Sequence, residues 1–485
     1  MSRLEEEIKF RQEKTRQVKK NGINPYPAKA QRSSTIHELL LNFNKLEMSG
    51  EEFGIVGRIK SIRGHGGSTF MHIADGTDSM QVYYKKDVVG QQSYEQMSNF
   101  LDIGDFISAS GNLFKTKKGE KTLQIKTFAL ISKSLRPLPE KWHGLSDVEI
   151  RYRQRYLDLI VNPSVKNNFS LRSKIIKTLR SLLENAGFLE VETPILQTIP
   201  GGANAEPFKT HHNSLDCDLY LRIAPELYLK RLIIGGFEKV FEIARCFRNE
   251  GIDRNHNPEF TQVEFYAAYW DYIKLMNFTE KLLFDLLTEV FGSPEIEFEK
   301  NKINFTPPFQ KLNFKEACKK FAEIDIEKDE LTKFVKNKKL DVPANSSRPK
   351  MLDEIFKALI LPNLVQPTFI TDYPIELSPL AKRKENENGY VERFQLVAAG
   401  KELCNAFSEL NDPADQKERF LDQEKLRKQG DHEAQRIDLE YIEALEYGMP
   451  PTAGIGIGID RLVALLTGSH SIKEIILFPT LKPKK

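Results

Sequence analysis

Apolar and polar residues alternate along two neighbouring stretches of the chain, residues 241–250 and 260–266, joined by a loop rich in Gly, Asp, Asn and Pro. Successive side chains of a strand point to opposite faces, so this alternation predicts two β-strands that form a hairpin. Phe260, Glu264 and Tyr266 share the polar face of the second strand. The arginine, carboxylate, amide and aromatic groups on this face suit the floor of a ligand site better than a surface turned to water.

A second alternating pattern fills residues 53–132, where five short segments are separated by turn signals such as Gly66-Gly67 and Asp75-Gly76. Five strands of this length predict a small closed β-barrel of the OB-fold type. The barrel and an antiparallel sheet flanked by helices, which the hairpin requires, together predict an α+β chain. Aromatic and amide side chains exposed on such a barrel stack on unpaired nucleotide bases and hydrogen-bond to them.

A chain of 485 residues is too long for one ordinary hydrophobic core, so we expect several domains. These are a basic N-terminal helix with its lead-in, the barrel domain, a proline-bearing linker with a hinge helix, and a large second domain. The basic helix face suits water and a nucleic-acid backbone equally well. The predicted ranges are 1–52, 53–134, 135–160 and 161–485, with an inserted helical region at about 275–351.

Composition adds constraints on the compartment. Hydrophobic residues make up 40% of the chain and charged residues 29%, and no window approaches the ~20 consecutive apolar residues of a membrane span. The N-terminus is charged and lacks the apolar run of a signal peptide. Four widely spaced cysteines without CxxC spacing argue against a zinc site or a disulfide scaffold, so we expect a cytoplasmic protein without membrane contact.

Three motifs carry a resemblance to a known family. Residues 247–260, FRNEG followed by R-x-H-x-P-E-F, resemble the second signature motif of class II aminoacyl-tRNA synthetases. GFLEVETPIL at 187–196 and GIGIGIDRLVALL at 454–466 resemble the first and third motifs, in the expected order. The segments at 142–160, 222–232 and 402–413 are similar to the lysyl branch of that family, and the resemblance covers nearly the whole chain.

The resemblance implies a site for ATP. It assigns Arg248 to the α-phosphate, His256 and Arg461 to the outer phosphates, and Glu250 and Phe260 to the amino group and face of adenine. The two arginines would be the catalytic residues. Arg461 also lies in the first turn of a predicted helix, where free amide groups and the helix dipole favour binding of phosphate.

The family also holds one to three Mg²⁺ ions through acidic groups. Glu402 matches one of these positions and should hold the magnesium that bridges phosphates. The other position reads Gln395, a neutral oxygen ligand, so an outer magnesium would bind weakly or through water. Glu409 is a further candidate ligand.

The strand ELCNAFSEL predicts the specificity. Asn405, Phe407 and Glu409 share one face by alternation and form an acidic, partly apolar slot that selects a long cationic side chain. Glu402 is out of step with them, which predicts a β-bulge if it too faces the site. The resemblance assigns the amide and the carboxylate of the slot to the ε-ammonium of L-lysine. It assigns the rest of the amino acid to Gly202 of a closing loop and to Glu226, Glu264 and Tyr266.

The barrel would read the anticodon of tRNA(Lys). Phe70 and Gln81 match the family's anticodon-reading aromatic and amide on successive strands. Phe70 alone would be interpreted as a barrel core residue, but its pairing with Gln81 favours the reader. A third reader is either Glu120 or Thr122.

The implied reaction has two steps: activation of lysine by ATP to lysyl-adenylate, and transfer of lysine to the 3′ end of tRNA(Lys). The first motif implies a homodimer.

Three alternative functions predict other residues. An aspartyl or asparaginyl enzyme would need a cation where Glu409 and Asn405 stand, and an RNA-binding paralogue would have lost Arg248 or Arg461. An enzyme that lysylates a protein would lack the barrel.

Overall fold

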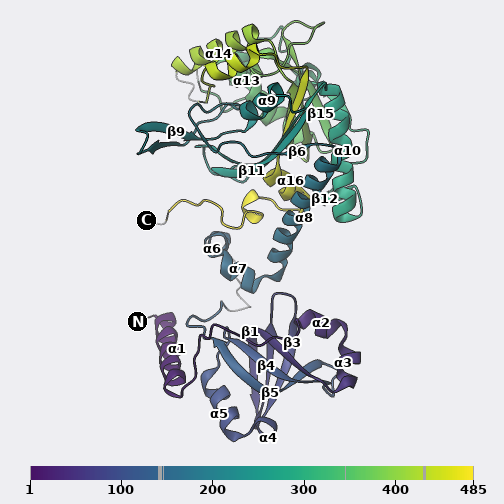
Figure 1. Cartoon of the computed structure of the whole chain (residues 1–485). Coiled ribbons are helices and arrows are strands. Elements are labelled where there is room, and N and C mark those ends of the chain that lie inside the picture. The colour runs from purple at the N-terminus through teal and green to yellow at the C-terminus, as the bar shows by residue number, and fades with distance from the viewer. Residues whose placement is uncertain (1, 140–144, 146, 344–345, 430–432, 484–485) are drawn as a thin grey trace. The chain divides into compact units, whose positions relative to one another are not determined.

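The computed structural model describes residues 2–139, 145, 147–343, 346–429 and 433–483. Contacts between residues divide the chain into two compact units, residues 1–146 and 147–485 (Figure 1). Among the described residues, no helix has both the length and the apolar character needed to cross a membrane. The predicted linker and hinge-helix range, 135–160, lies partly, at 140–144 and 146, outside the described residues.

The first unit contains a closed five-stranded barrel with the strand order β1-β2-β3-β5-β4. Alternate residues such as Ile55, Met71, Ile73 and Val82 fill its interior, so the predicted OB-type barrel is confirmed. Its strands are β1 (Glu52–His65), β2 (Ser68–Ala74), β3 (Ser79–Lys85), β4 (Phe106–Lys115) and β5 (Lys121–Ser132). Its helices are α1 (Arg3–Lys20), α2 (Ile36–Leu41), α3 (Phe43–Ser49), α4 (Lys86–Val89) and α5 (Gln91–Phe100).

The N-terminal helix α1 is held against its own unit by its basic side chains. The Lys14 ammonium lies 2.7 Å from a carboxylate oxygen of Asp102, and the buried Arg11 guanidinium donates to the carbonyl oxygen of Ile103 at 3.0 Å. A capping box between Ser2 and Glu5 begins the helix. Two cations of the basic helix therefore serve the packing of this unit.

The second unit is built on an eight-stranded sheet with the order β14-β15-β16-β17-β18-β11-β10-β6. The six central strands are antiparallel, as predicted, whereas the edge strands β6 and β14 run parallel to their neighbours. The sheet strands are β6 (Leu189–Glu190), β10 (Lys239–Phe247), β11 (Glu259–Ala268), β14 (Gln310–Asn313), β15 (Thr368–Pro374), β16 (Tyr390–Ala398), β17 (Lys401–Ser408) and β18 (Thr452–Gly458).

Smaller strands and helices surround this sheet. A three-stranded sheet contains β7 (Leu196–Gln197), β8 (Lys209–His212) and β9 (Cys217–Leu221), and a hairpin contains β12 (Glu295–Phe298) and β13 (Asn301–Asn304). The α-helices are α6 (Val148–Arg153), α7 (Arg155–Val161), α8 (Pro163–Asn185), α9 (Glu226–Ile234), α10 (Tyr272–Phe291), α11 (Phe314–Ala317), α12 (Leu331–Asn337), α13 (Arg348–Ile355), α14 (Pro413–Lys428), α15 (Leu439–Glu446) and α16 (Ile459–Leu466). The expected helical insertion at 275–351 is therefore mixed, because α10 packs in the main core and β14 joins the main sheet.

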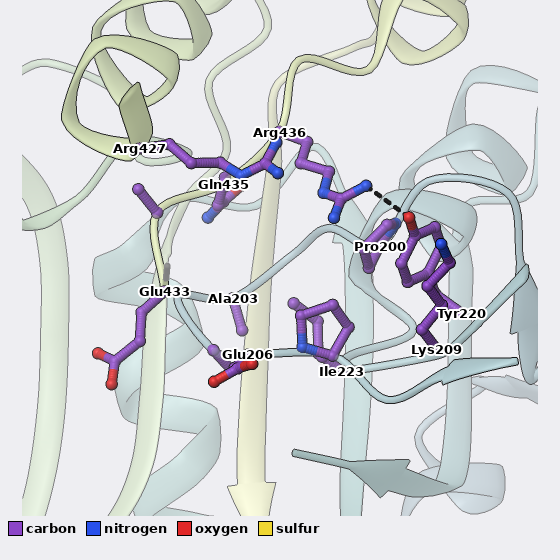
Figure 2. A pocket seen from close by; sticks show the side chains of 13 residues that line it. Pro200, Ala203, Glu206, Lys209, Tyr220, Ile223, Arg427, Glu433, Gln435 and Arg436 are labelled. Carbon is purple, nitrogen blue, oxygen red and sulfur yellow. Dashed lines mark hydrogen bonds between the residues drawn. The ribbon is translucent and has the colours of Figure 1, made fainter. Parts of the chain in front are cut away.

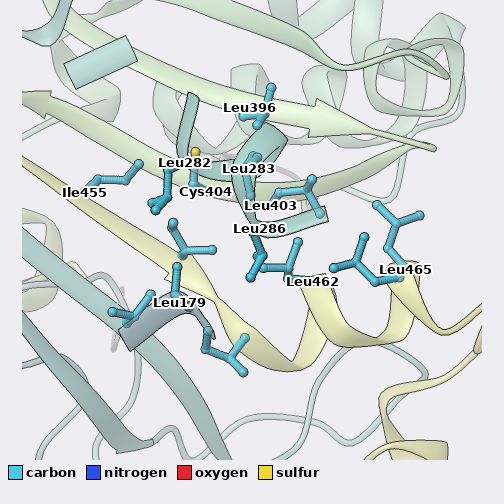
Figure 3. Close-up of a cluster of buried hydrophobic side chains, with 14 of the residues drawn as sticks. Leu179, Leu282, Leu283, Leu286, Leu396, Leu403, Cys404, Ile455, Leu462 and Leu465 are labelled. Carbon is cyan, nitrogen blue, oxygen red and sulfur yellow. The ribbon is translucent and has the colours of Figure 1, made fainter. Parts of the chain in front are cut away.

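The predicted hairpin is the pair β10 and β11, in which Phe241 pairs with Phe265 and Glu242 with Glu264. One face of the hairpin packs into a core formed with α8, α10 and α16, whose leucines appear in Figure 3. β10 ends one residue before Arg248, so the predicted extension of this strand to residue 250 was wrong. The chain turns away there into the loop.

The predicted bulge is present between β16 and β17. Leu396 pairs with Cys404 and Val397 pairs with Glu402, which leaves Leu403 without an opposite residue. The Leu403 side chain is buried in the core, as Figure 3 shows. The extra residue places Glu402 on the same side of the sheet as Asn405, as the sequence pattern required.

The core of the second unit should tolerate truncation poorly. Leu462 of α16 is fully buried, so Leu462→Ala should lower the free energy of unfolding by about 2–5 kcal/mol. Leu421→Ala, at a leucine that is 45% exposed, is the matched control and should change it by less than about 0.5 kcal/mol. Urea denaturation followed by circular dichroism measures both. Equal midpoints for the two variants would contradict this packing.

Candidate active site

A cavity of about 840 Å³ lies over the polar face of the sheet. Its walls come from segments that are far apart in the sequence: the loop after β7, the start of α9, the β10–β11 hairpin, β16, β17, β18 and α16. The structure brings most of the predicted residues together here: Gly202, Glu226, Arg248, Glu250, His256, Phe260, Glu264, Tyr266, Gln395, Glu402, Asn405, Phe407 and Arg461. The cavity therefore has the predicted chemistry, with basic groups in one region and carboxylates in another.

The basic region joins two motifs through side chains. Arg461 donates from Nη2 to Nε2 of His256 at 3.0 Å, and Nδ1 of His256 lies 2.8 Å from a carboxylate oxygen of Asp253. His256 accepts at Nε2, so its proton is on Nδ1 and is donated to Asp253. Nη1 of Arg461 also lies 3.7 Å from a carboxylate oxygen of Glu402. Two of the groups predicted for the outer phosphates therefore contact one another.

Arg248 lies beside the predicted adenine floor. The centre of its guanidinium is 5.0 Å from the centroid of the Phe260 ring, within the range of a cation–π contact. Its Nε atom is buried and has no hydrogen-bond partner among the described residues. A buried cationic donor without a partner suits an anionic ligand.

The start of α16 is fixed by a buried carboxylate. Asp460 accepts a hydrogen bond from the backbone N–H of Thr261 at 2.9 Å, and its other oxygen lies 2.6 Å from Nη1 of Arg172. These contacts tie α16 to β11 and to α8. Asp460 thus positions its neighbour Arg461 over the hairpin.

The acidic region is organised around a lysine that the sequence reasoning missed. The Lys230 ammonium, fully buried on α9, lies 2.6 Å from a carboxylate oxygen of Glu226 and forms a second ion pair with Glu409. It also lies 5.3 Å from the centroid of the Phe407 ring. The spacing of four residues between Glu226 and Lys230 in a predicted helix was the available signal, since such pairs share one helix face.

Glu264 lies in the same buried region. It accepts hydrogen bonds from Nε2 of Gln262 at 2.6 Å and from the Tyr266 hydroxyl at 2.9 Å. Burial, reinforced by the negative charge of Glu226, raises the pKa of Glu264 to about 8. Burial likewise raises the pKa of Glu409, although Lys230 opposes the shift. These carboxyl groups therefore favour a further cation.

Gly454 on β18 is required by this packing. A Cβ atom at this position would lie 2.2 Å from the Tyr266 ring and 2.3 Å from a carboxylate oxygen of Glu409. At Gly454 the protein's own side chains therefore occupy the space that the missing Cβ atom leaves.

The amide of the predicted slot already has a partner. Arg393 donates from Nε to Oδ1 of Asn405 at 2.8 Å, and from Nη1 to the hydroxyl of Ser378 at 2.8 Å. An amide oxygen has two lone pairs, so Asn405 can accept one further hydrogen bond there. Arg393 is a second cation of the site that the sequence reasoning did not include.

The predicted metal positions differ in suitability. Gln395 is buried, and its Oε1 accepts a hydrogen bond from the Tyr373 hydroxyl at 2.6 Å, which leaves one lone pair of a neutral oxygen. Glu402 offers one carboxylate at the cavity wall. Glu409 is enclosed beside Lys230, whose ammonium would compete with a metal ion for its carboxylate. In the described ranges, no set of three or more His, Cys, Asp or Glu side chains is arranged for a metal ion.

The barrel surface carries the predicted base-reading pair. The Phe70 ring stacks on Tyr83 with centroids 4.6 Å apart, and Oε1 of Gln81 accepts from the Thr122 hydroxyl at 2.9 Å. Thr122 is fully buried, whereas Glu120 is exposed and lies 3.1 Å from Nε2 of His72. Of the two candidates for the third reader, Glu120 is the accessible one.

Comparison with known proteins agrees with this geometry. Residues 147–482 match the family described as tRNA synthetases class II (D, K and N), and residues 54–131 match the OB-fold nucleic acid binding domain. The chain belongs to the class II tRNA synthetases.

Its relatives narrow the branch of that family. The Lysine--tRNA ligase of Pelotomaculum thermopropionicum is 52% identical over 99% of this chain and 96% of its own length. That of Carboxydothermus hydrogenoformans is 50% identical over 99% of both chains. That of Aquifex aeolicus is 51% identical over 89% of this chain and 73% of its own. Within the class II family, the branch is that of the lysine--tRNA ligases.

The buried lysine generates a testable prediction. Lys230→Met removes the cation between Glu226 and Glu409, so the pKa values of both carboxyl groups should rise further. Protonated carboxyls bind an ammonium weakly, so the KM for lysine in ATP–pyrophosphate exchange should rise at least about 10-fold at pH 7. As the pH is raised and the carboxyl groups ionise, the KM for lysine should fall part of the way back to the wild-type value. The KM for ATP should change little.

Lys239→Met is the matched control. The Lys239 ammonium donates to the carbonyl oxygen of Ala186 at 2.9 Å and does not line the cavity, so the KM for lysine should stay near the wild-type value. An unchanged KM for lysine in Lys230→Met, or a rise that is the same at every pH, would contradict the assigned role of Lys230.

Proposed function

We propose that the chain ligates L-lysine to tRNA(Lys) at the expense of ATP. The observation that carries this proposal is the pair of buried carboxyl groups of Glu226 and Glu264, which line the same cavity as the basic groups of the hairpin and α16. The carboxylate of Glu409 is enclosed beside Lys230, which also pairs with Glu226. A cavity with these two regions suits a substrate with two ammonium groups and a nucleotide with three phosphates. The full-length similarity to lysine--tRNA ligases supports the same activity.

In the first step, the lysine carboxylate attacks the α-phosphorus of ATP and pyrophosphate leaves. The nucleophile is already an anion, so no side-chain base is required, and catalysis consists of positioning and charge neutralisation. Arg248 neutralises the α-phosphate, and His256 and Arg461 receive the outer phosphates. Phe260 lies under adenine, and Glu250 accepts from its amino group.

In the second step, a hydroxyl group of the terminal ribose of tRNA attacks the carbonyl carbon of lysyl-adenylate, and AMP leaves. The ester bond to tRNA replaces the mixed anhydride bond. The residues that hold lysine in the first step hold it here as well. Gly202 and Glu226 bind its α-ammonium.

Selection of lysine depends on the enclosed carboxylates. Oε1 of Glu409 is buried and has no hydrogen-bond partner among the described residues, which supports its role as a receiver of the ε-ammonium. Glu264, Tyr266, Asn405 and Phe407 complete the walls of this slot. An amino acid without the second ammonium would leave buried carboxylates unpaired, and such mismatches discriminate by roughly 10⁴ or more.

Magnesium is the metal this donor set suits, because carboxylate and amide oxygens with water complete its shell. Glu402 would hold the ion, with Gln395 contributing at most a neutral contact. When bound, the ion neutralises phosphate charge. This chain offers a single carboxylate where the family usually offers two, so Arg461, held by its hydrogen bond to His256, neutralises a larger share of the phosphate charge.

The barrel supplies the contact with the anticodon. Phe70 stacks on one base, and its own contact with Tyr83 holds the ring in place. Gln81, oriented by Thr122, and the exposed Glu120 read base edges. These roles explain why a catalytic chain carries an OB-fold unit.

A homodimer and a cytoplasmic location complete the proposal. Leu189, Ile195 and Leu196 in the first motif are large apolar side chains that are 44–50% exposed, which favours burial against a second copy. The cysteines within the described residues are all free thiols, as expected in a reducing compartment.

Amino-acid-dependent ATP–pyrophosphate exchange tests this function across all twenty amino acids with magnesium present. Exchange with lysine alone, followed by lysine charging of tRNA(Lys), is the expected result. Arg248→Ala should abolish exchange, because it removes the cation at the α-phosphate. Exchange that depends on aspartate or asparagine would overturn the proposal. So would the absence of exchange with all twenty amino acids.

A further inference from the structure

A second cavity, of about 220 Å³, adjoins the active-site cavity (Figure 2). The two cavities share Ala203, Glu433, Ala434 and Gln435 in their walls. The rest of the smaller wall comes from the loop at 200–207, from β8 and β9, from Ile223, from the end of α14 and from Arg436 further along the chain. None of the roles assigned above uses this cavity.

Its most distinctive feature is an arginine stacked on a tyrosine. The centre of the Arg436 guanidinium lies 4.5 Å from the centroid of the Tyr220 ring, and its Nη1 donates to the Tyr220 hydroxyl at 2.9 Å (Figure 2). Among the described residues, no carboxylate lies within ion-pair distance of Arg436. The tyrosine therefore orients a cation that has no ion-pair partner within the part of the chain that the structure describes.

Other cations of this wall are already partnered. Lys209 pairs with Asp218 at 2.5 Å, and Arg427 lies 3.8 Å from Glu424. Both still line the cavity and add to its positive potential, which the carboxylates of Glu206 and Glu433 offset in part. Arg436 is thus the group best placed to receive an anion.

A buried acceptor gives a second, independent observation. Gln435 is 5% exposed, and its Oε1 has no hydrogen-bond partner among the described residues. Its Nε2 donates to Oδ1 of Asn204 at 3.3 Å, which fixes the amide. A buried acceptor without a partner costs about 1–3 kcal/mol, so a donor from a ligand would be favourable here.

The cavity wall is also tied to the catalytic hairpin. The backbone N–H of Asn249 donates to the carbonyl oxygen of Glu206 at 2.7 Å, and Asn249 follows Arg248 directly. A ligand in the smaller cavity therefore lies next to the segment that positions the proposed α-phosphate ligand.

We propose that this cavity binds a nucleotide of the single-stranded 3′ end of tRNA, next to the terminal adenosine. The inference rests on the proposed function, whose second step brings the terminal ribose into the larger cavity and so brings its neighbour to an adjoining one. Arg436 binds the phosphate, and Oε1 of Gln435 accepts a hydrogen bond from the exocyclic amino group of a cytosine or adenine. A cation beside an acceptor for a base is the combination that single-stranded RNA requires.

Arg436→Ala separates this inference from the proposed function. It should leave lysine-dependent ATP–pyrophosphate exchange within about twofold of wild type, because exchange needs no tRNA. It should lower kcat/KM for tRNA in charging by about 10- to 100-fold, the loss expected for one nucleotide contact. Arg436→Lys should retain part of the activity, and Tyr220→Phe should show a smaller loss.

Arg231→Ala is the matched control. Arg231 also lies over a tyrosine, 5.0 Å from the Tyr228 ring centroid, and binds Asp438 at 2.9 Å, but it lines neither cavity. Its charging activity should stay near wild type. A photoreactive nucleotide at the penultimate position of tRNA should crosslink to Tyr220 in the wild-type protein and not in Arg436→Ala.

Charging by Arg436→Ala at the wild-type kcat/KM would overturn the inference. So would an equal loss of exchange and charging, because the cavity would then only support the loop over the amino acid. Absence of lysine-dependent exchange in the wild-type protein would instead overturn the proposed function.

Discussion

The structure of the catalytic unit depends on one enclosed ammonium, that of Lys230, between the carboxylates of Glu226 and Glu409. Carboxylates buried in a protein interior are strongly destabilising unless cations and hydrogen bonds accompany them. One helix supplies the lysine and the first glutamate, and the chain just after β17 supplies the second. Gly454 lets β18 pass beside them. The sheet order therefore places the acidic groups where the fixed lysine neutralises only part of their charge, and a substrate ammonium neutralises more.

The end of the cavity proposed for ATP has basic side chains that face accessible space, in contrast to the buried acidic groups at the lysine end. There Arg248, His256 and Arg461 face solvent-accessible space, and the buried Asp460 fixes the helix that carries the last of them. The two arginines are fixed positive groups, and such groups facing an accessible cavity suit a phosphate-bearing ligand that enters from water. A common sheet holds both ends, so the reacting carboxylate and phosphorus meet in a geometry that the fold determines before either substrate binds.

Sequence reasoning succeeded where the pattern was local. Strand alternation predicted the barrel, the β10–β11 hairpin and the bulge at Leu403, because each depends on the order of neighbouring side chains. It missed Lys230 and Arg393, which bind carboxylate or amide partners brought together only by tertiary structure. It also could not show that the Tyr373 hydroxyl donates a hydrogen bond to the side-chain oxygen of Gln395. Parallel pairing of the edge strands likewise depends on the whole sheet, because no local alternation specifies strand direction.

Glu264, unlike the two carboxylates paired with Lys230, needs a substrate ammonium in order to ionise at neutral pH. Calorimetric titration with lysine at pH 7, in buffers of different ionisation enthalpy, measures the protons exchanged on binding. Burial raises the pKa of Glu264 to about 8, so it is mainly protonated at pH 7 in the free protein. A bound ammonium lowers that pKa, and the account predicts net proton release that is smaller in Glu264→Gln. Lysine binding with no proton release, or with release unaffected by Glu264→Gln, would contradict it.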